Sequence, residues 1–214
     1  MLLVLATKNQ GKIREIEKIL ERPGLEFRSL RDYPDIPEVQ EDGQTFLDNA
    51  LKKAELTALA TGEMTLADDS GLVVEILAGA PGVYSARFAG EGATDAANNQ
   101  KLLSLLEGVP EEGRKARFVC TMVLFAPDGA WKQAEGTCPG IITREPRGDQ
   151  GFGYDPVFFV PNYQKTMAEI PLEEKNRISH RAQALRKVRS HLEALAGTAR
   201  RPGAVPGLNS RKSV

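Results

Sequence analysis

The chain has 214 residues, a length typical of one domain that buries roughly 70% of the surface exposed by its unfolded state. Its composition of 41% hydrophobic and 27% charged residues is that of a globular protein and excludes a fibrous repeat or wholesale disorder. No apolar run approaches the roughly 18 residues that a membrane-spanning helix needs, and the apolar start is too short for a secretion signal. The two cysteines, Cys120 and Cys138, fit neither a disulfide framework nor a zinc motif, so we expect the protein in the reducing cytoplasm.

Charge is distributed unevenly along the chain, although 28 basic and 29 acidic residues leave a net charge of −1. Four of the basic residues lie within 197–214, which contains no acid, so residues 1–196 carry 24 basic and 29 acidic side chains. A net acidic body argues against nucleic-acid binding over a broad face, because such binding depends on clustered basic side chains. We expect one domain over residues 1–196 and a flexible basic tail over residues 197–214.

The first part of the sequence predicts alternating strands and helices. A five-residue apolar run leads into a polar loop and then into apolar residues at helical spacing, a pattern typical of a strand, a loop and a helix. Thr45 and Gly62 are candidate caps of a later helix. The expected elements are strands at 2–6 and 25–30, helices at 13–20 and 45–62, and a proline-rich loop at 33–44.

The rest of the sequence predicts a long hairpin with helices before and after it. Apolar runs on either side of Pro127-Asp128-Gly129 predict strands at 116–126 and 131–142, and the first is apolar on both faces, as in a strand covered on both sides. This order predicts a mixed α/β sheet with helices on both faces. The other expected elements are strands at 64–67, 72–76 and 156–160, helices at 94–108 and 179–195, and a glycine-rich loop at 79–92.

The polar loop after the first strand is a candidate phosphate site. Free backbone amides, the positive end of a helix and two lysines converge there, at Thr7, Lys8, Asn9, Gln10, Gly11 and Lys12. The segment lacks the spacing of a P-loop and of a dinucleotide fingerprint. A polar helix start with solvated lysines is the structural alternative.

Acidic residues in two places are candidate ligands of a divalent cation. Asp68 and Asp69 stand between two short apolar runs, and Mg²⁺ binds through one or two carboxylates together with water and phosphate oxygens. Neighbouring side chains of a strand point to opposite faces, so both acids face one ligand only if a turn intervenes. The loop acids Glu38, Glu41 and Asp42 are a second source of carboxylates, and an aspartate turn and solvated loop acids are the structural alternatives.

Two further segments suit a flat polar ligand. Residues 151–156, GFGYDP, place an aromatic ring between glycines beside a carboxylate, a pattern suited to stacking a ring and reading its edge. Lys175 and the run Ser179-His180-Arg181 supply donors near the start of the last helix. An aromatic turn entering the core and a basic helix face are the alternatives. No nucleophile has a recognisable base partner, so metal-assisted attack by water suits the available groups better than covalent catalysis.

Taken in order, seven segments between residues 3 and 188 resemble the inosine triphosphate pyrophosphatase family, whose members hydrolyse deaminated purine nucleoside triphosphates to monophosphate and pyrophosphate. The segments are LATKNQGK (5–12), EDGQTFLDNALKKA (41–54), LADDSGLVV (66–74), GAPGVYSARFAG (79–90), PGIITREPRG (139–148), GFGYDPVFFVP (151–161) and EEKNRISHRAQAL (173–185). The resemblance implies a two-lobed α/β fold with the active site in the cleft between the lobes, a requirement for Mg²⁺ and a homodimer.

The resemblance also implies a role for each candidate residue. Asp69 matches the metal-associated acid that activates water, and Asp68 and Glu38 are further candidate metal ligands. Lys8 stands where the family often has glycine, and Asp48 where it more usually has glutamate, which leaves the role of residue 48 open. Substrate contacts are implied for Thr7, Lys8, Asn9, Gln10, Gly11, Lys12, Lys53, Ser70, Phe152, Gly153, Tyr154, Asp155, Lys175, His180 and Arg181.

The expected reaction is attack of water on the α-phosphorus of inosine or xanthosine triphosphate, with pyrophosphate leaving. Two other functions are compatible with parts of the sequence. One is a regulatory module that binds a purine triphosphate without hydrolysing it, against which the two adjacent aspartates argue. The other is a phosphotransferase that forms an aspartyl phosphate, which needs a second aspartate two residues after the nucleophile, whereas Asp68 and Asp69 are adjacent.

Overall fold

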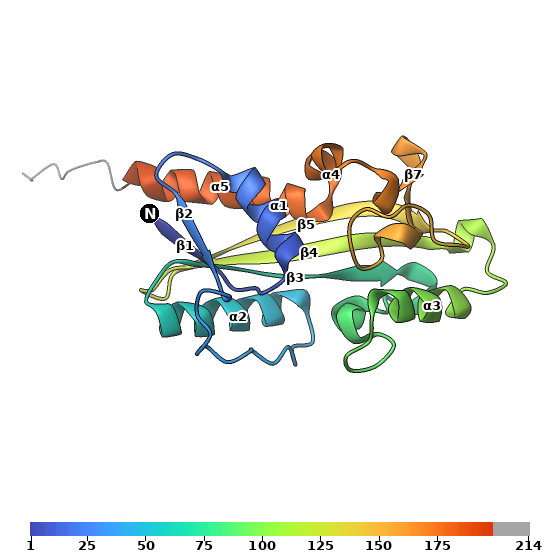
Figure 1. Ribbon diagram of the computed structural model, residues 1–214, viewed down its shortest axis with the longest axis horizontal. Helices are drawn as coiled ribbons and strands as arrows, with labels where there is room; N and C mark the ends of the chain where they lie inside the picture. The colour runs from blue at the N-terminus through green and yellow to red at the C-terminus, as the bar shows by residue number, and fades with distance from the viewer. Residues whose placement is uncertain (199–214) are drawn as a thin grey trace, which may run out of the picture.

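A computed structural model describes residues 1–198 and shows one open seven-stranded sheet in the order β2-β1-β3-β4-β5-β6-β7 (Figure 1). The first three strands in this order are parallel, and every pair from β3 onward is antiparallel. The strands are β1 (Leu2–Leu5), β2 (Glu26–Ser29), β3 (Thr65–Val74), β4 (Lys115–Phe125), β5 (Trp131–Ile142), β6 (Phe158–Val160) and β7 (Lys165–Thr166).

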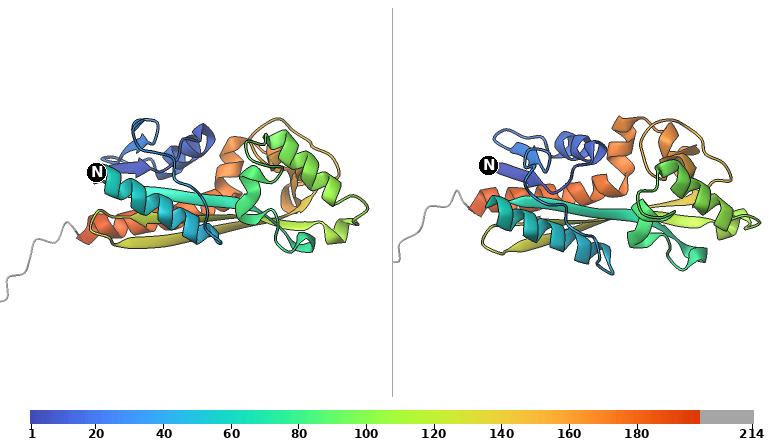
Figure 2. Two further views of the ribbon diagram at one scale, coloured as in Figure 1. Left: turned by 90° about the horizontal axis from the view of Figure 1, so that it is seen from below. Right: turned by 60° about the horizontal axis from the view of Figure 1, so that its bottom comes forward.

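Helices cover both faces of this sheet. α1, α4 and α5 lie on one face and α2 lies on the other, while Leu102 and Leu106 of α3 belong to the cluster around Leu72 and Val74 at the end of β3 (Figures 1 and 2). Their bounds are α1 (Gln10–Leu20), α2 (Phe46–Thr61), α3 (Asp95–Leu105), α4 (Leu172–Ile178) and α5 (His180–Thr198). The predicted mixed sheet with helices on both faces and a long hairpin, β4–β5, is therefore confirmed. No helix within residues 1–198 is long and apolar enough to cross a membrane.

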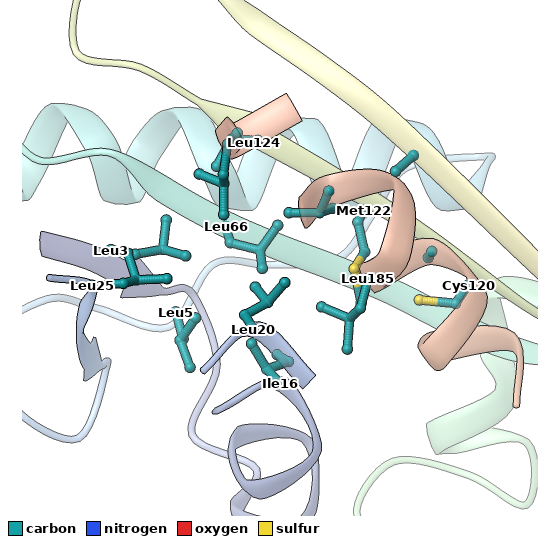
Figure 3. Packing of buried hydrophobic residues seen from close by; sticks show 14 of the residues in the cluster. Leu3, Leu5, Ile16, Leu20, Leu25, Leu66, Cys120, Met122, Leu124 and Leu185 are labelled. Carbon is teal, nitrogen blue, oxygen red and sulfur yellow. The ribbon is translucent and has the colours of Figure 1, made fainter. Parts of the chain in front are cut away.

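Apolar side chains on the two faces of the sheet form separate clusters. Leu3, Leu66 and Met122 pack against α1 and α5, with Leu185 among their contacts (Figure 3). On the other face α2 presents alanines to the sheet, so its backbone lies close to β3 and β4. A further cluster lies where β6 and α3 pack around Leu72 and Val74, at the end of β3. We call this part of the molecule the second lobe, and the part that contains β1, β2, α1 and α2 the first lobe. β4 is buried on both faces, as its sequence predicts.

The prediction of two separate strands at 64–67 and 72–76 is wrong. A single ten-residue strand, β3, runs through Asp68 and Asp69 without a turn. β4 supplies the reason: it pairs with β3 along its whole length, from Thr65 opposite Phe125 to Val74 opposite Ala116. Gly71 does not break the strand; it makes room for the 3-10 helix at Gly82–Arg87. A Cβ atom at residue 71 would lie 2.4 Å from the Gly82 carbonyl oxygen and 2.5 Å from Ser85 Oγ.

The glycine-rich segment 79–92, predicted as a loop, contains this 3-10 helix, and its Ser85 hydroxyl accepts a hydrogen bond from the Leu72 amide at 2.9 Å. At the other end of the chain α5 extends to Thr198, so the first two residues of the predicted tail are helical. Residues 199–214, and with them the rest of that tail, lie outside the described residues. The division at residue 196 stays a prediction.

Gly71→Ala is expected to lower the free energy of unfolding by about 1–3 kcal/mol, because the new methyl group meets backbone atoms of the 3-10 helix that cannot move alone. Urea unfolding at neutral pH measures the change. The matched control is Glu75→Ala, an exposed position just after β3, which should stay within about 0.5 kcal/mol of the wild type. Equal stability of the Gly71→Ala variant and the wild type would contradict tight docking of this segment on β3.

Candidate active site

A cleft of about 370 Å³ lies between the two lobes and takes side chains from both. The first lobe contributes the start of α1, the middle of β3 and the acidic loop, defined here as residues 38–43; the second contributes the 3-10 helix, α3 and the loop before β6. A neighbouring hollow of about 680 Å³ shares Thr7, Lys8, Lys12, Glu38 and Glu41 with the cleft and adds Lys53 and Arg87. The residues predicted from the sequence that line the cleft are Thr7, Lys8, Asn9, Lys12, Glu38, Asp69, Ser70, Phe152, Gly153, Tyr154, Asp155, Lys175, His180 and Arg181.

The start of α1 forms one end of the cleft because the chain turns sharply between β1 and α1. Asn9 caps the helix: its side-chain oxygen accepts a hydrogen bond from the Lys12 amide at 3.1 Å. The amides of Gln10 and Gly11 are left without an intrahelical partner, as in the first turn of any helix. The first turn contains no acid, so its positive end faces the cleft uncompensated. Gln10 itself is exposed and does not line the cleft.

Asp69 faces the α2 side of the sheet, where it is buried against Asn49. The Asn49 amide nitrogen donates to Asp69 Oδ2 at 2.9 Å, and the Asn49 oxygen accepts from the Gly43 amide at 2.8 Å. Burial raises the pKa of Asp69 to about 6, against the opposing effects of Lys53 and of the Asn49 hydrogen bond. One asparagine therefore holds both this carboxylate and the end of the acidic loop.

The acidic loop is fastened by cations from two elements. Lys53 on α2 donates to the Glu41 carboxylate and, at 2.6 Å, to the Asp68 carbonyl oxygen. Burial lowers the pKa of Lys53, but the negative charges of Asp68, Glu41 and Asp69 outweigh burial, so the pKa is raised and the ammonium stays charged. Arg87 donates to the Glu41 carbonyl oxygen at 2.7 Å from the second lobe. Glu38 is exposed at the rim of the cleft.

Asp68 points to the opposite face of β3 from Asp69, as the pleat of an unbroken strand requires. Lys12 Nζ lies 2.9 Å from Asp68 Oδ2, and Arg181 Nε lies 3.8 Å from the same oxygen. Burial raises the pKa of Asp68, but Lys12 and Arg181 outweigh burial, and the pKa lies well below its usual range. The structure thus does not bring the two adjacent aspartates to one ligand, and Asp68 does not line the cleft.

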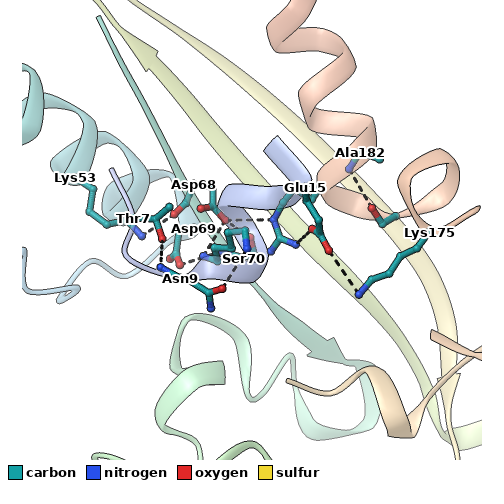
Figure 4. A network of polar contacts seen from close by, with 12 residues as sticks. Thr7, Asn9, Glu15, Lys53, Asp68, Asp69, Ser70, Lys175 and Ala182 are labelled. Atoms are coloured by element: carbon teal, nitrogen blue, oxygen red, sulfur yellow. Dashed lines mark hydrogen bonds and ion pairs between the residues drawn. The ribbon is translucent and has the colours of Figure 1, made fainter. Parts of the chain in front are cut away.

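A buried network continues from Asp68 toward the second lobe (Figure 4). Arg181 Nη1 lies 2.5 Å from Glu15 Oε2, Lys175 Nζ lies 3.6 Å from Glu15 Oε1, and Lys175 Nζ lies 2.5 Å from Asp155 Oδ2. Glu15, on α1, was not singled out from the sequence. The sequence does contain a feature that could have indicated its role: Glu15 lies between Ile13 and Ile16 on the buried face of α1. An acid in such a place needs a buried partner.

Phe152 lies in the cleft against the start of α1 and beneath two cations. A Cβ atom on Gly11 would lie 3.0 Å from Phe152 Cε1, so the ring touches the bare backbone of residue 11. Lys175 Nζ and Arg181 Cζ lie 5.2 and 5.5 Å from the ring centroid, within cation–π range. The ring therefore lies between the first turn of α1 and the cationic side chains of Lys175 on α4 and Arg181 on α5.

His180 is buried in the cleft wall and stacks on Phe118, with ring centroids 4.8 Å apart. Burial, followed by the positive charges of Arg181 and Lys175, lowers the pKa of His180 well below its usual value, so the imidazole is neutral at pH 7. Within residues 1–193, whose side chains are described, His180 Nδ1 and Arg181 Nε are buried without a hydrogen-bond partner. Arg181 Nε faces Asp68, and both side chains line the cleft.

The sequence left the role of Asp48 open and did not single out Asn49. Asp48 completes a capping box with Thr45: its carboxylate accepts from the Thr45 amide at 2.9 Å, and the Thr45 hydroxyl accepts from the Asp48 amide. Asn49 is fully buried one residue later. Because asparagine is a weak helix former, its place on the inner face of a helix is the sequence signal that could have indicated a tertiary role.

Comparison with protein-family models matches residues 3–191 to the Ham1 family. Among curated proteins, the chain is 55% identical over 195 residues to a dITP/XTP pyrophosphatase of Desulforamulus reducens, covering 91% of this chain and 97% of that protein. It is 56% identical over 190 residues to a dITP/XTP pyrophosphatase of Geobacter sulfurreducens, covering 89% of this chain and 96% of that protein.

Solved structures resemble this one over nearly their whole length. A HAM1 protein from Coxiella burnetii superposes with a TM-score of 0.84 at 42% sequence identity, covering 91% of this chain and 99% of that chain. The Ham1 protein of Staphylococcus aureus superposes with a TM-score of 0.83 at 41% identity, covering 91% and 100%. Both the sequence and the fold thus match the same group of proteins.

The neutral, buried state of His180 predicts a pH-dependent stability. The unfolded chain binds a proton at His180 below about pH 6.5 and the folded chain does not, so the free energy of unfolding falls as the pH drops below 6.5. The slope from this group approaches about 1.4 kcal/mol per pH unit. Urea unfolding between pH 7.5 and 5 should show a shallower loss in His180→Asn than in the wild type. Parallel pH profiles of the wild type and His180→Asn would contradict this prediction.

Proposed function

The chain belongs to the Ham1 family, and from this premise we propose that it hydrolyses the deaminated purine nucleoside triphosphates ITP, dITP and XTP to the nucleoside monophosphate and pyrophosphate. The two curated relatives named above support the reaction and the substrates. The observation that carries the proposal is the composition of the cleft: cations, free amides and Asp69 at one end, and an aromatic ring with buried donors at the other. This arrangement suits a purine triphosphate lying along the cleft.

The triphosphate is proposed to bind at the start of α1 and in the neighbouring hollow. Lys8, Lys12 and Lys53 line that hollow, and the amides of Gln10 and Gly11 stand at the positive end of the helix. These groups neutralise charge that grows on the leaving pyrophosphate as the bond to the α-phosphorus breaks. Lys12 is held in place by Asp68, which we propose to be a positioning residue in this pairing.

Asp69, with Glu38 or Glu41 of the acidic loop, is a donor set that fits Mg²⁺. Within residues 1–198 no cluster of three or more His, Cys, Asp or Glu side chains could hold a metal ion; Mg²⁺ nevertheless binds through one or two carboxylates when water and substrate oxygens complete its shell. Burial raises the pKa of Asp69 because it disfavours the ionised carboxylate, and a cation bound nearby would stabilise that ionised form. When bound, Mg²⁺ would neutralise charge on the phosphate oxygens.

Asp69 is also the proposed general base. With a pKa of about 6 the carboxylate is ionised at pH 7–8 and basic enough to accept a proton from the attacking water. Asn49 fixes Oδ2, and the Ser70 amide donates to Oδ1 at 3.0 Å, so the carboxylate is held in one orientation. Of the two aspartates in β3, Asp69 is the one that lines the cleft.

The base of the substrate is proposed to stack on Phe152 and to be read by the start of α5. Hypoxanthine and xanthine have a 6-keto acceptor where adenine has a 6-amino donor, so a charged donor such as Arg181 favours the first two. Arg181 and His180 both line the cleft, and His180 Nδ1 is buried without a hydrogen-bond partner within residues 1–193, so we propose that these two side chains read the base edge. A mismatched group against them costs roughly 1–3 kcal/mol.

Two features expected from the sequence stay predictions. A homodimer rests on the family resemblance, and sedimentation of the purified protein would measure the oligomeric state. The cytoplasmic location rests on the reduced cysteines; both are free and buried in the structure.

Pyrophosphate release from inosine, xanthosine, guanosine and adenosine triphosphates measures the proposed reaction. We expect release from the first two at rates at least about tenfold above the others, the discrimination that about 1.4 kcal/mol of mismatch produces. A chelator should abolish release, and added Mg²⁺ should restore it. Binding of inosine triphosphate without release from any nucleotide would instead support a regulatory nucleotide-binding module.

Asp69→Asn is expected to lower kcat by about 10²–10⁴-fold, because the amide cannot accept the proton from water. The fold should persist, since an amide can still bond to Asn49. Asp128→Asn in the β4–β5 turn is the matched control and should keep the wild-type rate. Turnover of Asp69→Asn within threefold of the wild type would remove Asp69 from the role of base.

A further inference from the structure

Gly153, the residue after Phe152, is held on both sides of its backbone by one face of α3. Its amide donates to Asp95 Oδ2 at 2.6 Å, and its carbonyl oxygen accepts from Asn99 Nδ2 at 3.0 Å. Asp95 and Asn99 are four residues apart, so they lie one above the other on the same helix face. Within the described residues, no other hydrogen bond involves the Gly153 backbone.

The contact with Gly153 explains why Asn99 is buried, and it gives Asp95 a long-range partner in addition to the helix end. Asn99 is 6% exposed, in the middle of a helix, where asparagine is a weak helix former and its burial costs free energy unless it is hydrogen-bonded. Its only hydrogen bond goes to Gly153, and its own oxygen is buried without a partner within the described side chains. Asp95 begins α3, where its negative charge is favoured by the helix end, and reaches across 58 residues of sequence.

The position of Gly153 sets the position of the Phe152 ring. The Phe152 amide donates to Asp155 Oδ2 at 3.1 Å on one side, and the Gly153 peptide is bound to α3 on the other. Between these two anchors the ring reaches the Gly11 backbone and lies beneath Lys175 and Arg181. A shift of the Gly153 peptide therefore moves the ring relative to the phosphate end of the cleft.

We propose that Asp95 and Asn99 are positioning residues for binding of the purine base, acting through the Gly153 backbone to hold the Phe152 ring in the cleft. The proposal rests on the proposed function of the cleft and extends it to a helix that supplies no group to the phosphates. Loss of either side chain loosens the ring and weakens binding of the base. The contacts at the phosphate end remain.

The test compares Asp95→Ala and Asn99→Ala with the conservative Asp95→Asn, which keeps an acceptor oxygen, and with Gln100→Ala, an exposed neighbour on α3. The measured quantities are KM and kcat for pyrophosphate release from inosine triphosphate, and Ki of inorganic tripolyphosphate, which has no base. Each alanine variant should raise KM about 5- to 10-fold, the effect of one hydrogen bond, with Ki within about twofold of the wild type. Asp95→Asn and Gln100→Ala should keep a wild-type KM.

A merely structural role would move KM and Ki together and lower the melting temperature in proportion; that result, or an unchanged KM, would overturn the proposal. Failure of the proposed function gives a different pattern, because then the wild type itself releases no pyrophosphate. In that case calorimetric titration of the wild type and the alanine variants with inosine triphosphate gives the comparison. Weaker binding of the nucleotide with unchanged binding of tripolyphosphate supports the role of α3, and equal affinities overturn it.

Discussion

Six charged side chains, three of each sign, alternate through the interior beside the cleft: Lys12, Asp68, Arg181, Glu15, Lys175 and Asp155. They come from α1, β3, α5, α4 and the segment before β6, so this one network connects both lobes. Burying a charge is costly, and removing one partner of a buried pair typically costs several kcal/mol because the other charge is left uncompensated. The balance of signs is therefore the constraint on which the site depends.

The network also separates the two ends of the cleft chemically. Lys12 at one end is positioned for phosphate, and Lys175 and Arg181 at the other lie over an aromatic ring. Burial, helped by the charges of Arg181 and Lys175, lowers the pKa of His180 and keeps it neutral, so that the imidazole offers a hydrogen-bonding edge without a further positive charge. A substrate with a triphosphate and a flat polar base finds a different environment at each end.

Buried asparagines on α2 and α3 form a second level of organisation. Asn49 on α2 connects Asp69 to the acidic loop, and Asn99 on α3 holds the peptide next to Phe152. Asn98 similarly bonds to the Ala86 carbonyl oxygen and the Ala89 amide, which fixes the 3-10 helix. In each case an uncharged side chain on a rigid helix satisfies a polar group of an irregular segment, so the loops around the cleft are anchored without adding charge.

Hydrophobic periodicity and turn residues in the sequence were enough to predict most helices, the long β4–β5 hairpin and the mixed sheet, because these patterns reflect local backbone preferences. Most of the candidate residues that the motifs singled out line the cleft, whereas Asp95, Asn98 and Phe118 line it without having been singled out. What the sequence could not determine is which side of β3 each aspartate serves: a local pattern of two aspartates and a glycine suggests a turn, and only pairing with β4 along the whole strand keeps β3 straight and separates Asp68 from Asp69. Glu15, Asn49 and Asn99 were missed for the same reason. Their partners lie 20 to 166 residues away, and only tertiary packing brings such groups within hydrogen-bonding distance.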